Sequence, residues 1–445
     1  MLNFKFIISG LILLVTLLFH EVEATCQLQI HHENKPLLIQ KFGSKEIIIQ
    51  GIDSIYLDEN DEIQAYCATG FMPFTVINNR YGSREMYNSA NKQILNFYCE
   101  SNKIRFNKQY SIRVSKVFDE YSDNNDESMP MSNIELYEEF IPKCSGRMYA
   151  MFESRNKLPN CEDALSYVLG AKLNTPIIIA GLCFDLDRLK LNYVSYKLRE
   201  PSSILEKFKE LYPMGLNGNS LSYPLTSADH LFKFPSDLSI QTDLKMQAMT
   251  NFWLQIANYE LDNIVQTTTR GLKLTLDDFK DFFNIIWWRN LRIGNWRRFM
   301  QLLDKRSKDV EYNVYTGTSG KLLTPVEKQK CDNVSSMELE LSAHAVIPQF
   351  VWIYLNSISE ETVEDFVVIA YNSPYFEYFD QNATIICNDM CNTIDWLQPI
   401  EDSRLVAALG RLYCCRSDEV VSLLDGFPLK PANQLNLTTE ATVEY

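Results

Sequence analysis

Hydrophobic positions along the chain follow two spacings, which predict both strands and helices. In residues 26–117, short apolar or alternating runs such as 45–50 (KEIIIQ), 62–67 (EIQAYC) and 105–117 are typical of β-strands. Later, extended runs such as 175–180 (TPIIIA) alternate with helical ones such as 203–211 and 246–265. The pattern predicts a small β-rich unit followed by a larger unit of the α/β or α+β class.

The first 24 residues have the pattern of a secretory signal peptide. Lys5 precedes an almost unbroken apolar run of about fourteen residues, and Val22 and Ala24 lie at the positions that a signal peptidase reads. We therefore expect cleavage after Ala24 and a secreted, extracellular protein without membrane contact in its mature form. The alternative is an N-terminal membrane anchor, but the run is shorter than the roughly twenty residues that a spanning helix needs.

Cysteine usage favours the same compartment. All eleven cysteines follow residue 24 and lack the paired C-x2-C spacing of zinc sites, so we expect disulfides. An odd count leaves at least one thiol free or paired between chains, and the spacing leaves the connectivity open. Asn333, Asn382 and Asn436 begin N-x-S/T triplets and are candidate glycosylation sites.

Length and composition indicate a folded chain with two structural units. With 46% hydrophobic and 22% charged residues, the sequence is typical of a globular protein. Residues 119–130 are acidic and polar and predict an exposed loop. We place the first unit at residues 25–145, the second at 146–430 and a polar tail at 431–445. The net charge of −15 disfavours polyanion binding except through a local basic patch.

Positive charge gathers in one short stretch, beside tryptophans. Asn295 is a candidate helix N-cap, and Phe299, Leu302 and Leu303 follow on one face of a helix predicted over 296–308. The stretch contains Arg289, Arg292, Arg297, Arg298, Lys305, Arg306 and Lys308, interleaved with Trp287, Trp288 and Trp296. Guanidinium groups for phosphates and indoles for bases favour a nucleic-acid groove. The alternative is a solvated helix face with core tryptophans.

Motifs in and around this stretch resemble those of the secreted insect branch of the DNA/RNA non-specific endonucleases, whose active site is a ββα-metal (His-Me) finger. Three elements of the family signature match residues 270–279 (RGLKLTLDDF), 294–296 (GNW) and 315–320 (YTGTSG). Further elements resemble residues 26–71, 182–185 (LCFD), 369–376 (IAYNSPYF) and 387–391 (CNDMC). The resemblance implies an α+β, nuclease-like second unit with a mixed sheet and helices.

The chain departs from the family where the chemistry lies. There, a histidine is the general base, an asparagine binds Mg2+ and a glutamate orients a metal-bound water. The corresponding positions hold Leu272, Arg292 and Met300, which cannot fill these roles, so the resemblance implies that no metal cofactor is retained. A rival alignment offers His230 as the base. Carboxylates at positions 277, 278 and 281 are a second route, as a rebuilt metal site.

We therefore expect a secreted nucleic-acid-binding protein with weak or no hydrolysis, similar to the salivary nuclease-like proteins of blood-feeding flies. Its contacts to DNA or RNA would come from Arg270, Arg289, Arg292, Trp296, Arg297, Arg298 and Lys305, with Arg292 meeting the phosphate in place of a metal. One alternative is an active Mg-dependent endonuclease with a displaced base such as His230. Another is a non-catalytic secreted interaction scaffold.

Overall fold

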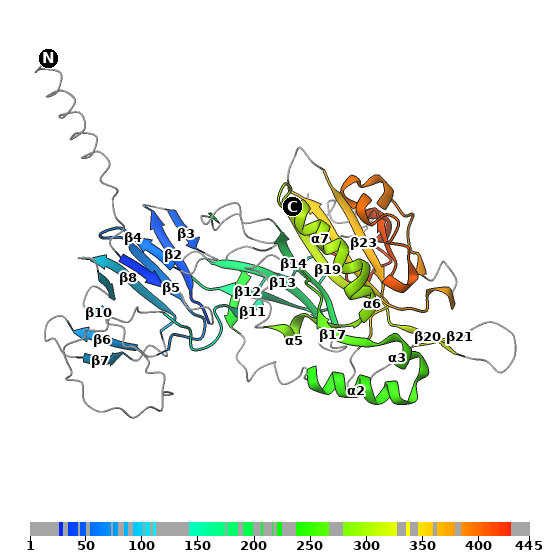
Figure 1. Cartoon of the computed structure of the whole chain (residues 1–445), viewed down its shortest axis with the longest axis horizontal. Helices are drawn as coiled ribbons and strands as arrows, with labels where there is room; N and C mark the ends of the chain where they lie inside the picture. Colours follow the sequence, from blue (N-terminus) through cyan, green and yellow to red (C-terminus); the bar gives the residue numbers. More distant parts are fainter. Residues whose placement is uncertain are drawn as a thin grey trace, which may run out of the picture. The chain divides into compact units, whose positions relative to one another are not determined.

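Figure 1 shows the computed structural model of the chain. It describes residues 26–29, 34–42, 45–49, 54–72, 74–78, 84–87, 92–100, 103–106, 110–112, 142–173, 176–185, 190–198, 206–207, 216, 220–224, 237–266, 279–326, 335–338, 346–358, 363–378 and 384–428. The chain divides into two compact units, Met1–Met148 with Ile204–Lys207, and Tyr149–Ser203 with Phe208–Tyr445. Strands and helices are both present, so the expected mixture of α and β structure is confirmed.

The first unit is a β structure held by two disulfides. Its nine-stranded sheet has the order β15 (Glu206–Lys207), β3 (Lys45–Ile49), β2 (Leu37–Phe42), β5 (Glu62–Tyr66), β8 (Ile94–Glu100), β9 (Lys103–Phe106), β10 (Tyr110–Ile112), β6 (Phe74–Asn78) and β7 (Arg84–Tyr87). A separate pair joins β1 (Cys26–Gln29) to β4 (Ser54–Leu57). Cys26–Cys99 and Cys67–Cys144 are buried in its core, so the expected disulfides are confirmed here.

The helix that the sequence predicts over residues 203–211 is wrong within the described residues. Residues 203–211 were predicted as helical, but Glu206 and Lys207 form β15 and pair with Ile48 and Ile47 of β3. The backbone groups along the open side of β3 need hydrogen-bond partners. The hydrogen bonds that β15 forms with them outweigh the helical propensity of so short a run.

The second unit is built on a nine-stranded sheet in which every described pair of neighbouring strands is antiparallel, which selects the α+β class over α/β. Its order is β16 (Leu221–Pro224), β11 (Ala150–Ser154), β12 (Leu165–Ala171), β13 (Ile177–Asp185), β14 (Lys190–Leu198), β19 (Tyr312–Ser319), β22 (Phe350–Ser357), β23 (Asp365–Tyr371) and β24 (Leu412–Cys415). Near-continuous burial along β12, β13, β19 and β22 places these central strands inside the unit.

A hairpin followed by a helix positions the candidate site. β17 (Tyr259–Asn263) pairs antiparallel with β18 (Asn284–Trp288). The chain then turns into α6 (Arg289–Leu291), a π-helical turn η4 (Arg292–Trp296) and α7 (Arg297–Arg306). Two helices precede the hairpin, α2 (Asp237–Thr250) and α3 (Phe252–Ala257), drawn in green in Figure 1.

The helical run predicted over residues 246–265 is therefore broken. Asn251 caps α3 by accepting hydrogen bonds from the backbone N–H groups of Trp253 and Leu254, at 3.0 and 3.3 Å. Asn258 then takes a left-handed conformation, with φ of 55°, and ends the helix. These two asparagines leave residues 259–263 free to form β17.

The helix predicted over residues 296–308 is present as α7, but its start differs. Phe299 and Leu303 are buried as expected, and Leu302 is half-buried. Asn295 is not the N-cap, because its side-chain amide donates to the backbone oxygens of Ser403 and Gly410, at 2.6 and 2.7 Å. The backbone is broken at Gly294, whose φ and ψ are not helical, and it is helical from Trp296 into α7.

The remaining elements are short: α5 (Lys280–Phe283), the pair β20 (Leu323–Val326) and β21 (Ser335–Glu338), η5 (Phe376–Tyr378), η6 (Cys391–Thr393), η7 (Asp395–Ile400), η8 (Ala407–Leu409) and α9 (Ser417–Val420). Disulfides Cys161–Cys183, Cys387–Cys415 and Cys391–Cys414 lie in this unit. The eleventh cysteine, Cys331, lies outside the described residues. None of the described helices has the length and apolarity that a membrane crossing requires. The disulfides are compatible with an extracellular protein.

Candidate functional site

Several residues singled out from the sequence lie outside the described part of the chain. They are the expected signal peptide at 1–24, the expected loop at 119–130, the expected tail at 431–445, His230, Arg270, Leu272, Asp277, Asp278 and the three sequon asparagines Asn333, Asn382 and Asn436. Asp281 falls within α5, whose bounds alone are described at that position. The site is therefore built from β17, β18 and the helical segment that follows them.

Arg292 lies between two carboxylates of β17. Its Nε and Nη2 each lie 2.6 Å from Glu260 Oε1, and its Nη1 lies 2.6 Å from Asp262 Oδ2. Glu260 and Asp262 are two residues apart on a strand, so their side chains leave the same face. Arg289 adds a longer contact, with Nε 3.7 Å from Glu260 Oε2. We name these four residues the Arg292 ion cluster.

The Arg292 ion cluster does not fit a Mg2+ ion. The side chain of Arg292 is 21% exposed, and both nearby carboxylates already accept its hydrogen bonds. A guanidinium is a permanent cation that repels a metal ion and offers it no lone pair. Met300, where the family has a glutamate, is buried and carries a thioether, which is a poor ligand for a hard ion. Position 292, where the resemblance predicts a metal ligand, therefore holds a guanidinium that is paired with two carboxylates.

Within the described residues, no general base of the expected kind stands near the cluster. These residues contain no histidine. Tyr259, next to Glu260, donates its hydroxyl to the backbone oxygen of Asn372 at 3.3 Å. Burial raises the pKa of Tyr259 well above its usual value of 10. Its phenol is therefore neutral at physiological pH and cannot accept a proton from water.

The tryptophans of the basic stretch belong to the core. Trp287 and Trp296 are both fully buried, with ring centroids 5.4 Å apart, and Phe299 packs on Trp296 at 5.7 Å. Trp288 is also buried. The expectation that Trp296 stacks on a nucleic-acid base is therefore wrong for this structure, because protein side chains already cover its ring. The alternative of core tryptophans holds.

The GNW motif anchors the start of the helix. Gly294 has φ −91° and ψ −115°, and a Cβ built on it would lie 2.5 Å from the backbone oxygen of Leu409. Glycine is the residue that permits this approach. Asn295 then donates to two carbonyls of the same 403–410 segment. The motif thus fixes the position of Arg292 by joining η4 to a distant loop.

A second buried asparagine holds the hairpin against the large sheet. The Asn372 amide donates to the backbone oxygens of Ile286 and Pro348, at 2.9 and 3.0 Å, and its carbonyl accepts from the N–H of Trp288 at 2.7 Å. Asn372 is fully buried at the end of β23. It lies in the residue run IAYNSPYF, so this motif also supports the fold around the site.

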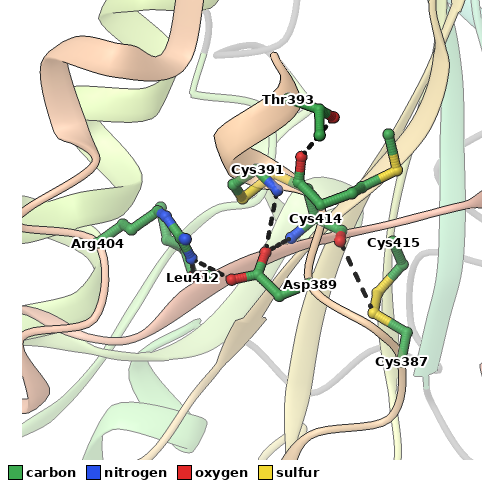
Figure 2. A network of polar contacts seen from close by, with 9 residues as sticks. Cys387, Asp389, Cys391, Thr393, Arg404, Leu412, Cys414 and Cys415 are labelled. Atoms are coloured by element: carbon green, nitrogen blue, oxygen red, sulfur yellow. Dashed lines mark hydrogen bonds and ion pairs between the residues drawn. A yellow bond between two sulfur atoms is a disulfide. The ribbon is translucent and has the colours of Figure 1, made fainter.

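The CNDMC segment forms a cross-linked corner at the edge strand β24, shown in Figure 2. The Asp389 carboxylate accepts the backbone N–H groups of Cys391 and Cys414, each at 3.1 Å, and pairs with Arg404. Asp389, Cys391 and Cys414 form the one candidate metal-ligand group within the described residues. Because both sulfurs are joined in a disulfide, this group is a structural corner without thiolates.

Positive charge remains exposed on one face of α7. Arg297, Arg298 and Lys305 are exposed, and no ion pair to them is present among the described residues. On a helix these positions fall within about a third of the circumference. We name them the α7 basic face. Arg306 differs, since its Nη2 lies 2.5 Å from Glu364 Oε1, and Arg292 differs because it is held in its ion cluster.

The sequence reasoning found Arg292 but missed its partners. Glu260 and Asp262 lie in a run that we interpreted as helical, and their spacing of two residues has meaning only on a strand. The alternation of large apolar and acidic residues in Tyr259–Asn263 is the sequence pattern that predicts this strand. No protein-family model and no curated protein matches this chain, so its likeness to the nuclease family rests on the motif residues alone.

Proposed function

We propose that this chain is a secreted nucleic-acid-binding protein on a nuclease-like ββα scaffold, with hydrolysis weak or absent. The observation that carries the proposal is the Arg292 ion cluster, in which the guanidinium at the position of the expected metal ligand is paired with Glu260 and Asp262. The order β17, β18 and then α7 is the order of elements that a ββα finger has. On this proposal the chain keeps the scaffold of a nuclease and uses it without a metal or a histidine base.

The proposed contact surface differs from the one that the sequence alone suggested. Arg292 is engaged by two carboxylates, so it serves the scaffold and does not contact phosphate. The α7 basic face supplies the free positive charge, and Arg289 adds a half-exposed guanidinium that keeps only a 3.7 Å contact to Glu260. Lysine and arginine side chains on an exposed helix face bind phosphates and release counterions. This local charge overcomes the repulsion that a net charge of −15 exerts on a polyanion.

Salt dependence of binding tests this surface. Arg298→Ala/Lys305→Ala removes two phosphate contacts, so the slope of log Kd against log salt for duplex DNA should become shallower by about 1.8. Fluorescence anisotropy with labelled DNA and RNA measures the slope. The matched control is Lys92→Ala/Arg155→Ala, which removes the same charge at exposed positions outside α7. Equal slopes for the two double variants would exclude the α7 basic face as the contact surface.

Cleavage assays separate this proposal from an active enzyme. Plasmid DNA and RNA incubated with the purified, disulfide-bonded chain should stay intact whether Mg2+ or EDTA is present, and retardation in a gel should be the same in both. Efficient cleavage that EDTA abolishes would instead establish the Mg-dependent endonuclease. Absence of any retarded nucleic acid at micromolar protein and low salt would leave the interaction scaffold.

A further inference from the structure

A pocket of about 440 Å³ lies between α2, α3 and β17. Its volume falls in the range of small-molecule sites. The residues that line it are Gln241, Leu244, Lys245, Ala248, Leu254, Gln255, Asn258, Tyr259, Glu260 and Leu261. Leu244 and Leu254 are buried and supply an apolar part of the lining, whereas the amides and Lys245 are exposed. Glu260 joins the pocket to the Arg292 ion cluster.

The pocket chemistry matches a flat ring with polar edges. Gln241, Gln255 and Asn258 each carry an amide that both donates and accepts, and within the described residues none of these amides has a protein partner. The leucine side chains that line the same pocket suit the apolar faces of an aromatic ring. A nucleobase combines these two requirements, because its faces stack on apolar groups and its edges need donors and acceptors.

A cation stands beside the same pocket. The backbone N–H of Arg289 donates to the backbone oxygen of Asn258 at 3.3 Å, which places the start of α6 next to a lining residue. The Arg289 side chain is 51% exposed, and its contact to Glu260 is the longest of the cluster at 3.7 Å. Arg289 is therefore able to exchange this contact for a phosphate oxygen with little rearrangement.

We propose that this pocket accepts one unstacked base of a single-stranded nucleic acid while Arg289 contacts the adjoining phosphate. The inference rests on the proposed function and deepens it, because it names single strands as the preferred ligand. The α7 basic face supplies binding that is independent of sequence, and the pocket adds a contribution that requires a base.

Abasic strands test the pocket. Anisotropy compares a labelled single-stranded oligodeoxythymidylate with a strand of the same length and charge in which abasic residues replace the nucleosides. The intact strand should bind about tenfold more tightly, which is the size of effect that one buried base contributes. In Gln241→Leu/Gln255→Leu this ratio should fall toward one, while affinity for the abasic strand is unchanged. Both positions are exposed on helices, and circular dichroism checks that the fold is kept.

The matched control is Asn392→Leu/Gln398→Leu, which changes two exposed amides in the same way outside the pocket and should keep the tenfold ratio. Equal binding of intact and abasic strands overturns the pocket inference and leaves the proposed function intact. An unchanged ratio in Gln241→Leu/Gln255→Leu also overturns it. Failure of both strands to bind, in contrast, overturns the proposed function itself.

Discussion

Position 292 shows how one side chain changes what a site can do. An amide there would leave two acidic groups of β17 free for a metal, whereas the guanidinium neutralises both and forms hydrogen bonds to each. Glu260 and Asp262 are 29% and 38% exposed, so water covers them only in part. Arg292 consequently stabilises the charged form of both carboxylates, and this contribution is measurable in the free energy of unfolding.

Arg292→Met keeps an unbranched apolar stem and removes the charge. We expect the free energy of unfolding to fall by about 1–3 kcal/mol, because two half-buried carboxylates lose their partner. Urea denaturation measures the change. Arg298→Met is the control, and its exposed position predicts a change within about 0.5 kcal/mol. A variant at position 292 that is as stable as its control would show that the cluster contributes nothing to the fold.

At the residue scale, the sequence predicts which positions lack the expected base and metal-site residues. It does not predict the carboxylates that pair with Arg292. It is the resemblance to the nuclease family that predicts Leu272, Arg292 and Met300 at the base and metal-site positions. The acidic partners of Arg292 lie about thirty residues earlier, and only the pairing of β17 with β18 brings them close. Contacts of this kind depend on strand register, which a short apolar run does not determine.

At the scale of elements, the hairpin and helix keep their arrangement through polar side chains that bind distant backbone groups. Asn372 joins β18 to the large sheet, and Asn295 joins η4 to residues 403–410. Each amide satisfies buried carbonyls that water does not reach. Contacts with distant segments thus fix the position of the hairpin through Asn372 and the position of the helical segment that follows it through Asn295.

Asn372→Ala should loosen the hairpin. The change leaves the carbonyls of Ile286 and Pro348 and the N–H of Trp288 without this partner, so we expect a loss of about 2–4 kcal/mol in the free energy of unfolding. Hydrogen exchange followed by mass spectrometry should show faster exchange in β17 and β18 than in β12 and β13. The exposed Asn392→Ala serves as the control. Unchanged exchange in the hairpin would contradict the anchoring role.

Strands were easier to predict than helices in this chain. The β-branched runs at residues 45–50, 62–67 and 175–180 coincide with β3, β5 and β13 within a few residues. The helical runs at 203–211 and 246–265 were wrong in part, since the side-chain cap at Asn251, the left-handed backbone of Asn258 and edge pairing by Glu206 override weak helical periodicity.

At the scale of the whole molecule, buried phenols connect stability to alkaline pH. Burial raises the pKa of Tyr167, Tyr315 and Tyr371 to about 12 from the usual 10. Burial also raises the pKa of Tyr193, Tyr196, Tyr354 and Tyr413, again as the largest cause. Folded chains therefore retain protons that unfolded chains release between pH 10 and 12.

The direction of the effect follows from these shifts. Stability from the buried phenols is complete below pH 10 and falls as the pH rises toward 12, by about 1.4 kcal/mol per pH unit for each phenol. We expect a cooperative alkaline transition in which tyrosinate absorbance and loss of near-ultraviolet circular dichroism coincide. Gradual tyrosine ionisation up to pH 12 with unchanged circular dichroism would contradict this expectation.

The two-residue strand β15 has a consequence for how the protein can be divided. Because Ile204–Lys207 belongs to the first unit and the flanking residues belong to the second, the polypeptide passes between the units three times, at 148–149, 203–204 and 207–208. A protease cut at 148–149 alone separates residues 1–148 from the rest of the polypeptide, and β15 stays on the second fragment, paired with β3 only through hydrogen bonds. Neither unit is therefore a cassette that a single recombination event could transfer intact to another gene.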